Sequence, residues 1–148
     1  MPGRDGIVHL CVFWRTLPGV RFFYASGQSL QKGVVMDLYF GVAGPGRVGM
    51  SLAKAFAAAG LSCAGVYGGT HAKARAAELG VRHFNEPLGL VAAADIIFIC
   101  VPDRFINEAA ESMAKAAAQA GLDVCGKYFY HVSGSAGLDE LAPLKALG

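Results

Sequence analysis

Residues 38–60, LYFGVAGPGRVGMSLAKAFAAAG, join an apolar run to an alanine-rich run through closely spaced glycines. These glycines are Gly44, Gly46 and Gly49. The apolar run predicts a buried strand, and the run from Arg47 predicts a helix that ends at Gly60. A strand that passes into a helix through such a turn points to an α/β fold.

The alternation of strand-like and helix-like runs continues to the end of the chain. After the first unit we expect strands over 61–69, 81–85, 95–102 and 127–134. We expect helices over 70–80, 103–121 and 137–148, and a weak helix or turn over 86–94. Thr70 and Asp103 stand at expected N-caps. Strands alternating with helices predict parallel β-α-β units, so the expected fold class is α/β, a doubly wound parallel sheet.

Composition excludes several classes of protein. With 148 residues, 54% hydrophobic and 16% charged, the chain has the size and composition of one globular domain. A net charge of +2 without a basic stripe argues against a nucleic-acid partner. No run approaches the roughly 18 to 20 apolar residues of a membrane span, so no membrane partner is expected.

The cysteines and histidines show no metal-ligand spacing, and we expect no metal site. The cysteines are Cys11, Cys63, Cys100 and Cys125. Because they form no C-x-x-C pair and most lie in or beside apolar runs, we expect buried free thiols in a reducing, cytoplasmic protein.

Residues 1–37 do not follow the alternation. We interpret them as an irregular leader that is disordered or lies outside the natural protein, since Met36 stands just before the first good strand. The alternative is an added hairpin at the edge of the sheet. Residues 38–148 are the predicted α/β domain.

The glycine turn has the spacing of a dinucleotide-binding turn. In such turns the first glycine permits a tight bend, the second lets the pyrophosphate approach the backbone, and the third allows close packing of helix on strand. The helix N-terminus then offers free N–H groups to the phosphates. Pro45 lacks an N–H and stiffens the bend. The alternative is a purely structural corner.

The end of the second expected strand favours NADP over NAD. NAD-binding proteins often place an acid roughly 20 residues after the glycine turn, but residues 66–75, VYGGTHAKAR, hold none. Thr70, His71 and Lys73 supply donors and positive charge there. Alternatively Lys73 and Arg75 belong to the solvated face of a short helix, and for Arg75 we favour that interpretation.

Two further turns are expected at the same edge of the sheet, VPD at 101–103 and HVSGSAG at 131–137. His131 is a weak candidate for a catalytic proton donor, and a satisfied strand histidine is the favoured alternative. Ser133 has no identifiable base partner, which argues against a hydrolase.

The segments GVAGPGRVGMSLAKAFAAAG, DIIFICVPD and HVSGSAGLDELAPLKALG together resemble a family of two-domain Rossmann-like proteins described as NADP oxidoreductase-like. More distantly the chain is similar to pyrroline-5-carboxylate reductases and deazaflavin-dependent NADP reductases. The resemblance covers about residue 38 to the last residue, and HVSG followed by LDELAPL is its most specific part.

The resemblance implies a cofactor position residue by residue. The pyrophosphate would lie on Gly44, Gly46, Arg47 and Val48, beside Pro45 and Gly49. The adenosine end would lie near Gly68, Thr70 and Lys73, and the nicotinamide near Val101, Pro102 and Ser133.

In the proteins that it resembles, a helical C-terminal domain closes the active site and commonly mediates dimerisation. The chain stops at Gly148, so we expect a truncated domain, and the resemblance implies a homodimer formed through the missing C-terminal helical domain.

The sequence therefore predicts an NADP(H)-binding Rossmann domain of an oxidoreductase that moves hydride between nicotinamide and an unidentified small-molecule substrate. Two alternatives stay open. One is a non-catalytic dinucleotide sensor or regulatory module, and the other is a domain that binds FAD or S-adenosylmethionine at the same turn.

Overall fold

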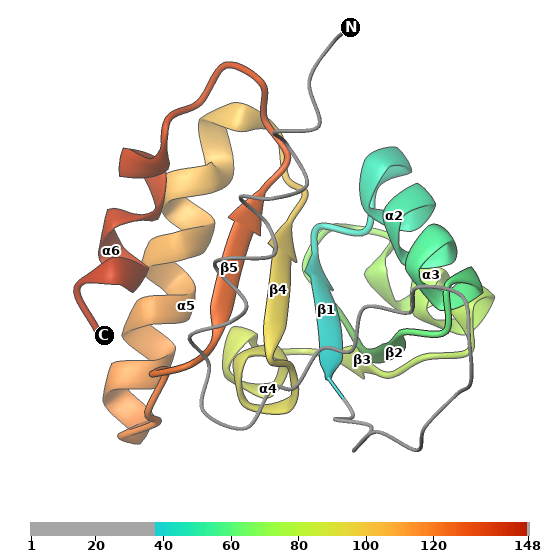
Figure 1. Cartoon of the computed structure of the whole chain (residues 1–148), viewed down its shortest axis with the longest axis horizontal. Helices are drawn as coiled ribbons and strands as arrows, with labels where there is room; N and C mark the ends of the chain where they lie inside the picture. The colour runs from blue at the N-terminus through green and yellow to red at the C-terminus, as the bar shows by residue number, and fades with distance from the viewer. Residues whose placement is uncertain (1–37, 148) are drawn as a thin grey trace, which may run out of the picture. The chain divides into compact units, whose positions relative to one another are not determined.

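The computed structural model describes residues 38–147, and these form one compact unit (Figure 1). The interpretation of residues 1–37 as a leader lies outside the described residues. The strands are β1 (Tyr39–Ala43), β2 (Ser62–Tyr67), β3 (His83–Phe84), β4 (Ile96–Ile99) and β5 (Tyr128–His131). The α-helices are α2 (Arg47–Ala58), α3 (Ala72–Leu79), α4 (Pro87–Ala93), α5 (Ile106–Ala120) and α6 (Ala142–Lys145). Two 3₁₀ turns are η1 (Asp103–Phe105) and η2 (Leu138–Leu141).

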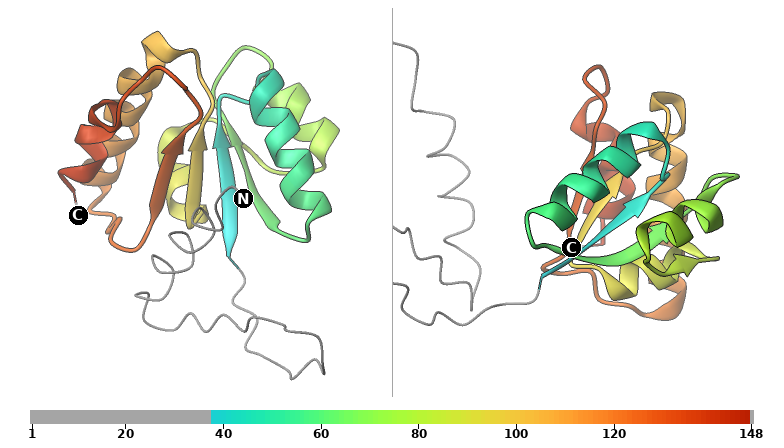
Figure 2. Two further views of the ribbon diagram at one scale, coloured as in Figure 1. Left: turned by 45° about the horizontal axis from the view of Figure 1, so that its top comes forward. Right: turned by 90° about the vertical axis from the view of Figure 1, so that its right-hand side faces the viewer.

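The strands form one parallel sheet in the order β3-β2-β1-β4-β5. The first strand, β1, lies in the middle of the sheet, β2 and β3 follow on one side of it, and the chain then crosses back to β4 on the other side. This reversal confirms the predicted doubly wound sheet. In Figure 2 (left) the strands run in one direction, so the loops that follow them gather at one end of the sheet.

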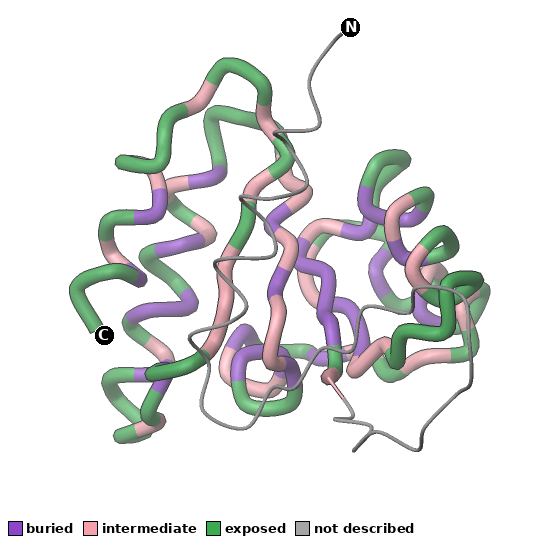
Figure 3. Tube along the Cα trace, viewed as in Figure 1, coloured by how far each residue is buried: buried purple, intermediate pink, exposed green. Residues whose placement is uncertain are grey.

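Two apolar clusters cover the two faces of the sheet, because successive strand residues point to opposite faces. On one face, Phe40, Val42 and Val66 pack with Ala53 of α2 and Ala76 of α3. The other face packs against α4, α5 and α6, with Leu90, Ile97, Ile99, Ile106 and Met113 fully buried. Figure 3 shows this buried layer running through the central strands and the inner faces of the helices.

Two helix starts differ from those predicted. Helix α3 begins at Ala72 after His71, so Thr70 lies in the preceding turn and is not its N-cap. Helix α5 begins at Ile106, because Asp103 opens the 3₁₀ turn η1 instead of capping the helix. Neither helix has a side-chain cap. In both places the residues that precede the helix make the turn at the end of a strand.

The cysteine prediction is only partly correct within residues 38–147. Cys63 and Cys100 are free and half-buried, but Cys125 is free and exposed. Burial raises the pKa of the Cys100 thiol to about 11. Among the described helices none is long and apolar enough to cross a membrane.

Candidate functional site at the carboxyl ends of the strands

The glycine turn after β1 is held between the ends of β2 and β4. The backbone N–H of Gly44 donates a 2.8 Å hydrogen bond to the carbonyl oxygen of Tyr67. Gly44 has a φ of 83°, which favours glycine. A Cβ at Gly44 would lie 2.8 Å from Cγ1 of Val101. The fold therefore requires a glycine at this position.

Gly49 allows helix α2 to approach the strand that precedes it. A Cβ at Gly49 would lie 2.7 Å from the carbonyl oxygen of Gly44 and 2.9 Å from Cγ1 of Val42. Gly49 is buried, and it lies in the first turn of α2. The fold requires this glycine too, as the close helix–strand packing of the motif predicts.

Gly46 differs from both. It is exposed, its φ is −77°, which any residue adopts, and no described atom lies within 4 Å of a Cβ placed there. Packing and backbone conformation therefore leave this glycine unexplained. The space beside Gly46 is open to a ligand.

The start of α2 adjoins this open space. Gly46 is the N-cap, and its carbonyl oxygen accepts the first helical hydrogen bond, from the N–H of Met50 at 2.9 Å. No side chain caps the helix and none of its first-turn residues is acidic. The N–H groups of Arg47, Val48 and Gly49 therefore lack a partner within the helix and lie at the positive end of its dipole. This is the arrangement that binds phosphate groups.

The turn after β2 lies beside the glycine turn. Gly68 and Gly69 have positive φ values of 80° and 85°. A Cβ at Gly68 would lie 3.9 Å from the backbone nitrogen of Gly44. Thr70, His71 and Lys73 are exposed along this turn and the start of α3. Residues 66–75 hold no Asp or Glu, so this turn itself carries no negative charge.

Arg75 forms an ion pair within α3. Its guanidinium lies 3.1 Å from the Glu78 carboxylate, which also accepts a 2.7 Å hydrogen bond from Lys54. The hydrogen bond from Lys54, followed by that from Arg75, lowers the pKa of Glu78. Arg75 therefore belongs to the solvated ion-pair face of α3, as the favoured interpretation predicted.

A polar cluster lies at the ends of β4 and β5. The hydroxyl of Ser135 donates a 2.6 Å hydrogen bond to Oδ2 of Asp103, across 32 residues of chain. Oγ of Ser133 accepts the backbone N–H groups of Ser135 and Ala136 at 3.1 and 3.0 Å. The hydrogen bond from Ser135 holds the pKa of Asp103 below its usual value. Sequence reasoning had named Ser133 but missed this pairing.

His131 ends β5 and faces the loop that follows it. Its Nε2 lies 3.2 Å from the carbonyl oxygen of Gly137, which only accepts, so Nε2 carries the proton. Its Nδ1 is buried and has no partner among the described residues. In this arrangement His131 ties down the loop after β5, and its catalytic role stays a prediction.

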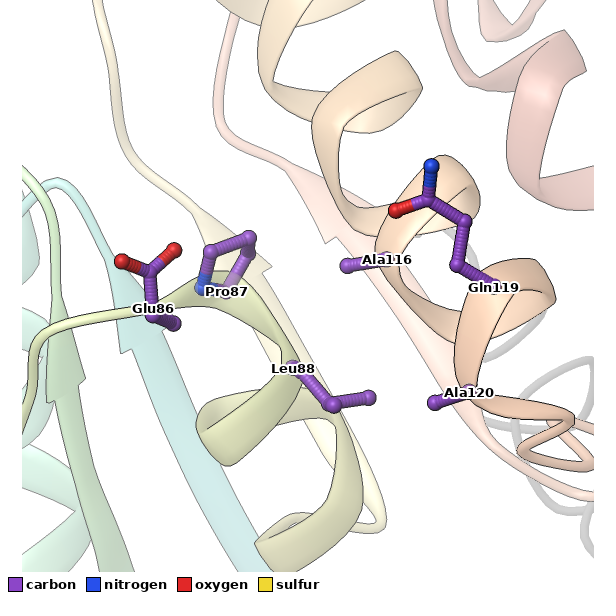
Figure 4. Close-up of a pocket in the computed structure, with 6 residues that line it drawn as sticks. All are labelled: Glu86, Pro87, Leu88, Ala116, Gln119 and Ala120. Atoms are coloured by element: carbon purple, nitrogen blue, oxygen red, sulfur yellow. The ribbon is translucent and has the colours of Figure 1, made fainter.

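The open edge of the sheet is distinct from a groove of about 320 Å³ between α4 and α5 (Figure 4). Pro87, Leu88, Ala116 and Ala120 give that groove an apolar lining, with Glu86 and Gln119 at its border. It lies on the face of the sheet opposite α2, so it is not part of the site. In the described part of the chain, no three His, Cys, Asp or Glu side chains come together as metal ligands.

The reversal of strand order beside β1, with the glycine turn at that point, defines a Rossmann-like nucleotide-binding domain. The family model for the Rossmann-like domain matches residues 28–148, and the chain belongs to this family. No curated protein matches the sequence.

Solved structures with this fold include cofactor domains of dehydrogenases and reductases. UDP-N-acetylglucosamine 3-dehydrogenase from Acidithiobacillus ferrooxidans is 25% identical over 76% of this chain and 35% of its own, with a TM-score of 0.57. Pyrroline carboxylate reductase from Plasmodium falciparum, solved with NADP bound, is 16% identical over 76% of this chain and 38% of its own, with a TM-score of 0.56. A protein from Bacteroides fragilis assigned as an NADP oxidoreductase is 20% identical over 68% of this chain and 37% of its own, with a TM-score of 0.50.

The chain thus spans little more than a third of the length of each of these proteins. They support the fold and its resemblance to the nicotinamide-cofactor domains of oxidoreductases.

Proposed function

We propose that the chain binds NADP(H) across the carboxyl edge of its sheet and serves as the cofactor domain of an oxidoreductase that transfers hydride to or from a small molecule. The observation that carries the proposal is Gly46. Gly44 and Gly49 are required by the fold, whereas Gly46 has an ordinary φ and open space around it. A glycine is needed there if a ligand approaches the backbone, and the pyrophosphate of a dinucleotide is such a ligand.

The chain's own residues bind and orient the cofactor. The N–H groups at the start of α2 hold the pyrophosphate, with Arg47 exposed beside them. Gly68, Thr70 and Lys73 border the adenosine end, and Val101, Pro102 and Ser133 border the nicotinamide end. The bound nicotinamide would supply the hydride chemistry.

NADP is preferred over NAD in this proposal because of the turn after β2. A 2′-phosphate meets no carboxylate between residues 66 and 75, and Lys73 is exposed with no ion pair among the described residues. Arg75 contributes less, because Glu78 already neutralises it. The positive charge that selects the phosphate is therefore assigned to Lys73, with hydroxyl and imidazole donors from Thr70 and His71.

Calorimetric titration of the chain with NADP, NADPH, NAD and NADH tests the proposal. We expect the two phosphorylated cofactors to bind more tightly than their counterparts. Failure of all four to bind would overturn the assignment of the site. Equal or reversed affinities would keep the dinucleotide site and overturn the choice of NADP.

A further inference from the structure

The polar cluster formed by Asp103, Ser133 and Ser135 lies outside the two apolar clusters that cover the sheet. All three residues belong to turns that follow the adjacent strands β4 and β5. Asp103 and Ser135 are exposed, Ser133 is half-buried, and none of the three belongs to the apolar core. Asp103 lies two residues beyond Val101, whose side chain packs beside Gly44 of the glycine turn. The cluster therefore borders the part of the edge where the proposed function places the nicotinamide.

The side-chain hydrogen bonds of the cluster run from Ser133 to Ser135 and from Ser135 to Asp103. Ser135 donates its only hydroxyl hydrogen to Asp103, because the carboxylate only accepts. Ser133 accepts two backbone N–H groups, so its hydroxyl hydrogen is free to point to Oγ of Ser135, 3.3 Å away. Both hydroxyls therefore stabilise the ionised form of Asp103, and its carboxylate is a fixed negative charge at this end of the site.

Among the described residues, Asp103 forms no ion pair. The guanidinium of the adjacent Arg104 lies over the ring of Phe105, 4.7 Å from its centroid. His131 is the other basic side chain near Asp103, and its Nε2 donates to the carbonyl oxygen of Gly137. The carboxylate is consequently available to a positive charge on a ligand.

We propose that this cluster distinguishes the two redox states of the bound cofactor, binding oxidised NADP⁺ more tightly than NADPH. The inference rests on the proposed function and goes beyond it. The nicotinamide ring is positively charged when oxidised and neutral when reduced, so a nearby carboxylate stabilises only the oxidised form. The phosphates and the adenosine are the same in both forms, and their contacts do not affect the ratio of the two affinities.

The experiment measures the dissociation constants of NADP⁺ and NADPH for the wild-type chain and for Asp103→Asn. The substitution keeps the shape of the side chain and removes its charge. We expect the ratio of the NADPH constant to the NADP⁺ constant to fall by about three- to tenfold, the size of one charge interaction at a few ångströms in a solvated site. Asp103→Glu keeps the charge and is expected to retain most of the preference.

Asp123→Asn is the matched control. Asp123 follows α5 at the opposite edge of the sheet, where its Oδ1 accepts the N–H of Cys125, and asparagine can keep that bond. The control should leave the ratio unchanged. Raising the salt concentration should narrow the preference of the wild-type chain and have little effect on Asp103→Asn.

The outcomes separate this inference from the proposed function. If the wild-type chain binds neither form, the proposed function fails and this inference fails with it. If both forms bind and Asp103→Asn weakens them equally, Asp103 only bonds a group common to both, and the redox inference is overturned. If Asp103→Asn changes neither dissociation constant, the redox inference is overturned as well.

Discussion

The backbone N–H of Gly44 donates a 2.8 Å hydrogen bond to the carbonyl oxygen of Tyr67, the last residue of β2. This bond joins the turn after β1 to the end of the neighbouring strand and leaves the start of α2 open to solvent. The glycines of one turn therefore have separable roles. Gly44 and Gly49 support the fold, and we assign Gly46 to the proposed cofactor site.

Gly46→Val should abolish cofactor binding while leaving the domain folded. Valine is compatible with the backbone φ of −77° at this position, and a Cβ there meets no described atom within 4 Å. The branched side chain would instead occupy the space of the pyrophosphate. Circular dichroism and thermal unfolding report the fold, and calorimetry with NADP⁺ reports binding. A folded variant that binds normally would show that the glycine turn is only a structural corner.

Gly49→Ala is the contrasting variant. Its new methyl group would lie 2.7 Å from the carbonyl oxygen of Gly44, which is backbone and cannot move aside cheaply. We expect it to lower the free energy of unfolding by about 1–3 kcal/mol, as overpacking does elsewhere. Gly46→Val should cost less stability than Gly49→Ala, and the reverse order would contradict the assigned roles.

Lys73→Glu should weaken NADP⁺ binding more than NAD⁺ binding. The substitution places a carboxylate where the 2′-phosphate is proposed to lie, and repulsion acts only on the phosphorylated cofactor. We expect a loss of about tenfold or more for NADP⁺, from the removal of one attraction and the addition of one repulsion. Lys115→Glu makes the same charge change on the exposed surface of α5 and should affect neither cofactor. Equal losses for the two cofactors at Lys73→Glu would argue against a phosphate contact.

The fold could be predicted because the local sequence patterns indicate the same strands and helices that the folded domain contains. The apolar strand 39–43, its glycine turn and the helix after it are each encoded by neighbouring residues, so the first β-α unit follows from the sequence. Parallel pairing then follows from the alternation of strands and helices. The helix starts at Thr70 and Asp103 were wrong because capping residues also form strand-end turns, and spacing alone does not separate the two uses.

Contacts between distant turns were not predictable. Asp103 and Ser135 meet across 32 residues because β4 and β5 are neighbours in the sheet, and no local pattern encodes that pairing. The orientation of the His131 ring could not be predicted either. A strand histidine shows its position in sequence but not which backbone carbonyl its ring will meet, and the partner here is Gly137 in the following loop.

His131→Ala should loosen the loop after β5. The variant loses the hydrogen bond from Nε2 to Gly137, worth about 0.5–1.5 kcal/mol. Amide hydrogen exchange at Ser135 and Ala136 should speed up, because their N–H groups bond Ser133 within that loop. His131→Gln carries an amide donor on a side chain of similar length and is expected to restore part of the protection. Unchanged exchange in His131→Ala would show that the histidine does not position the loop.

Hydride transfer by this chain alone should be slow even where cofactor binding is tight. Catalysis requires a substrate held against the nicotinamide with water excluded. Around the proposed nicotinamide position, Pro102, Asp103 and Ser135 are exposed, Val101 and Ser133 are half-buried, and no described element covers them. In this arrangement the His131 Nε2 donates to Gly137 and its Nδ1 is buried, so neither ring nitrogen faces the exposed edge without rearrangement of the loop.

The assay follows NADPH absorbance with a panel of small imines, ketones and aldehydes, using Gly46→Val as the non-binding blank. We expect rates indistinguishable from that blank for the wild-type chain, although calorimetry under the same conditions detects bound NADPH. Binding without turnover would mean that positioning of the substrate, and not possession of the cofactor, limits the reaction. Robust turnover would contradict this, because it would show that the chain already holds a substrate against the nicotinamide and excludes water. His131→Gln would then be the first variant to assay, since a catalytic acid cannot be replaced by an amide whereas a loop anchor can.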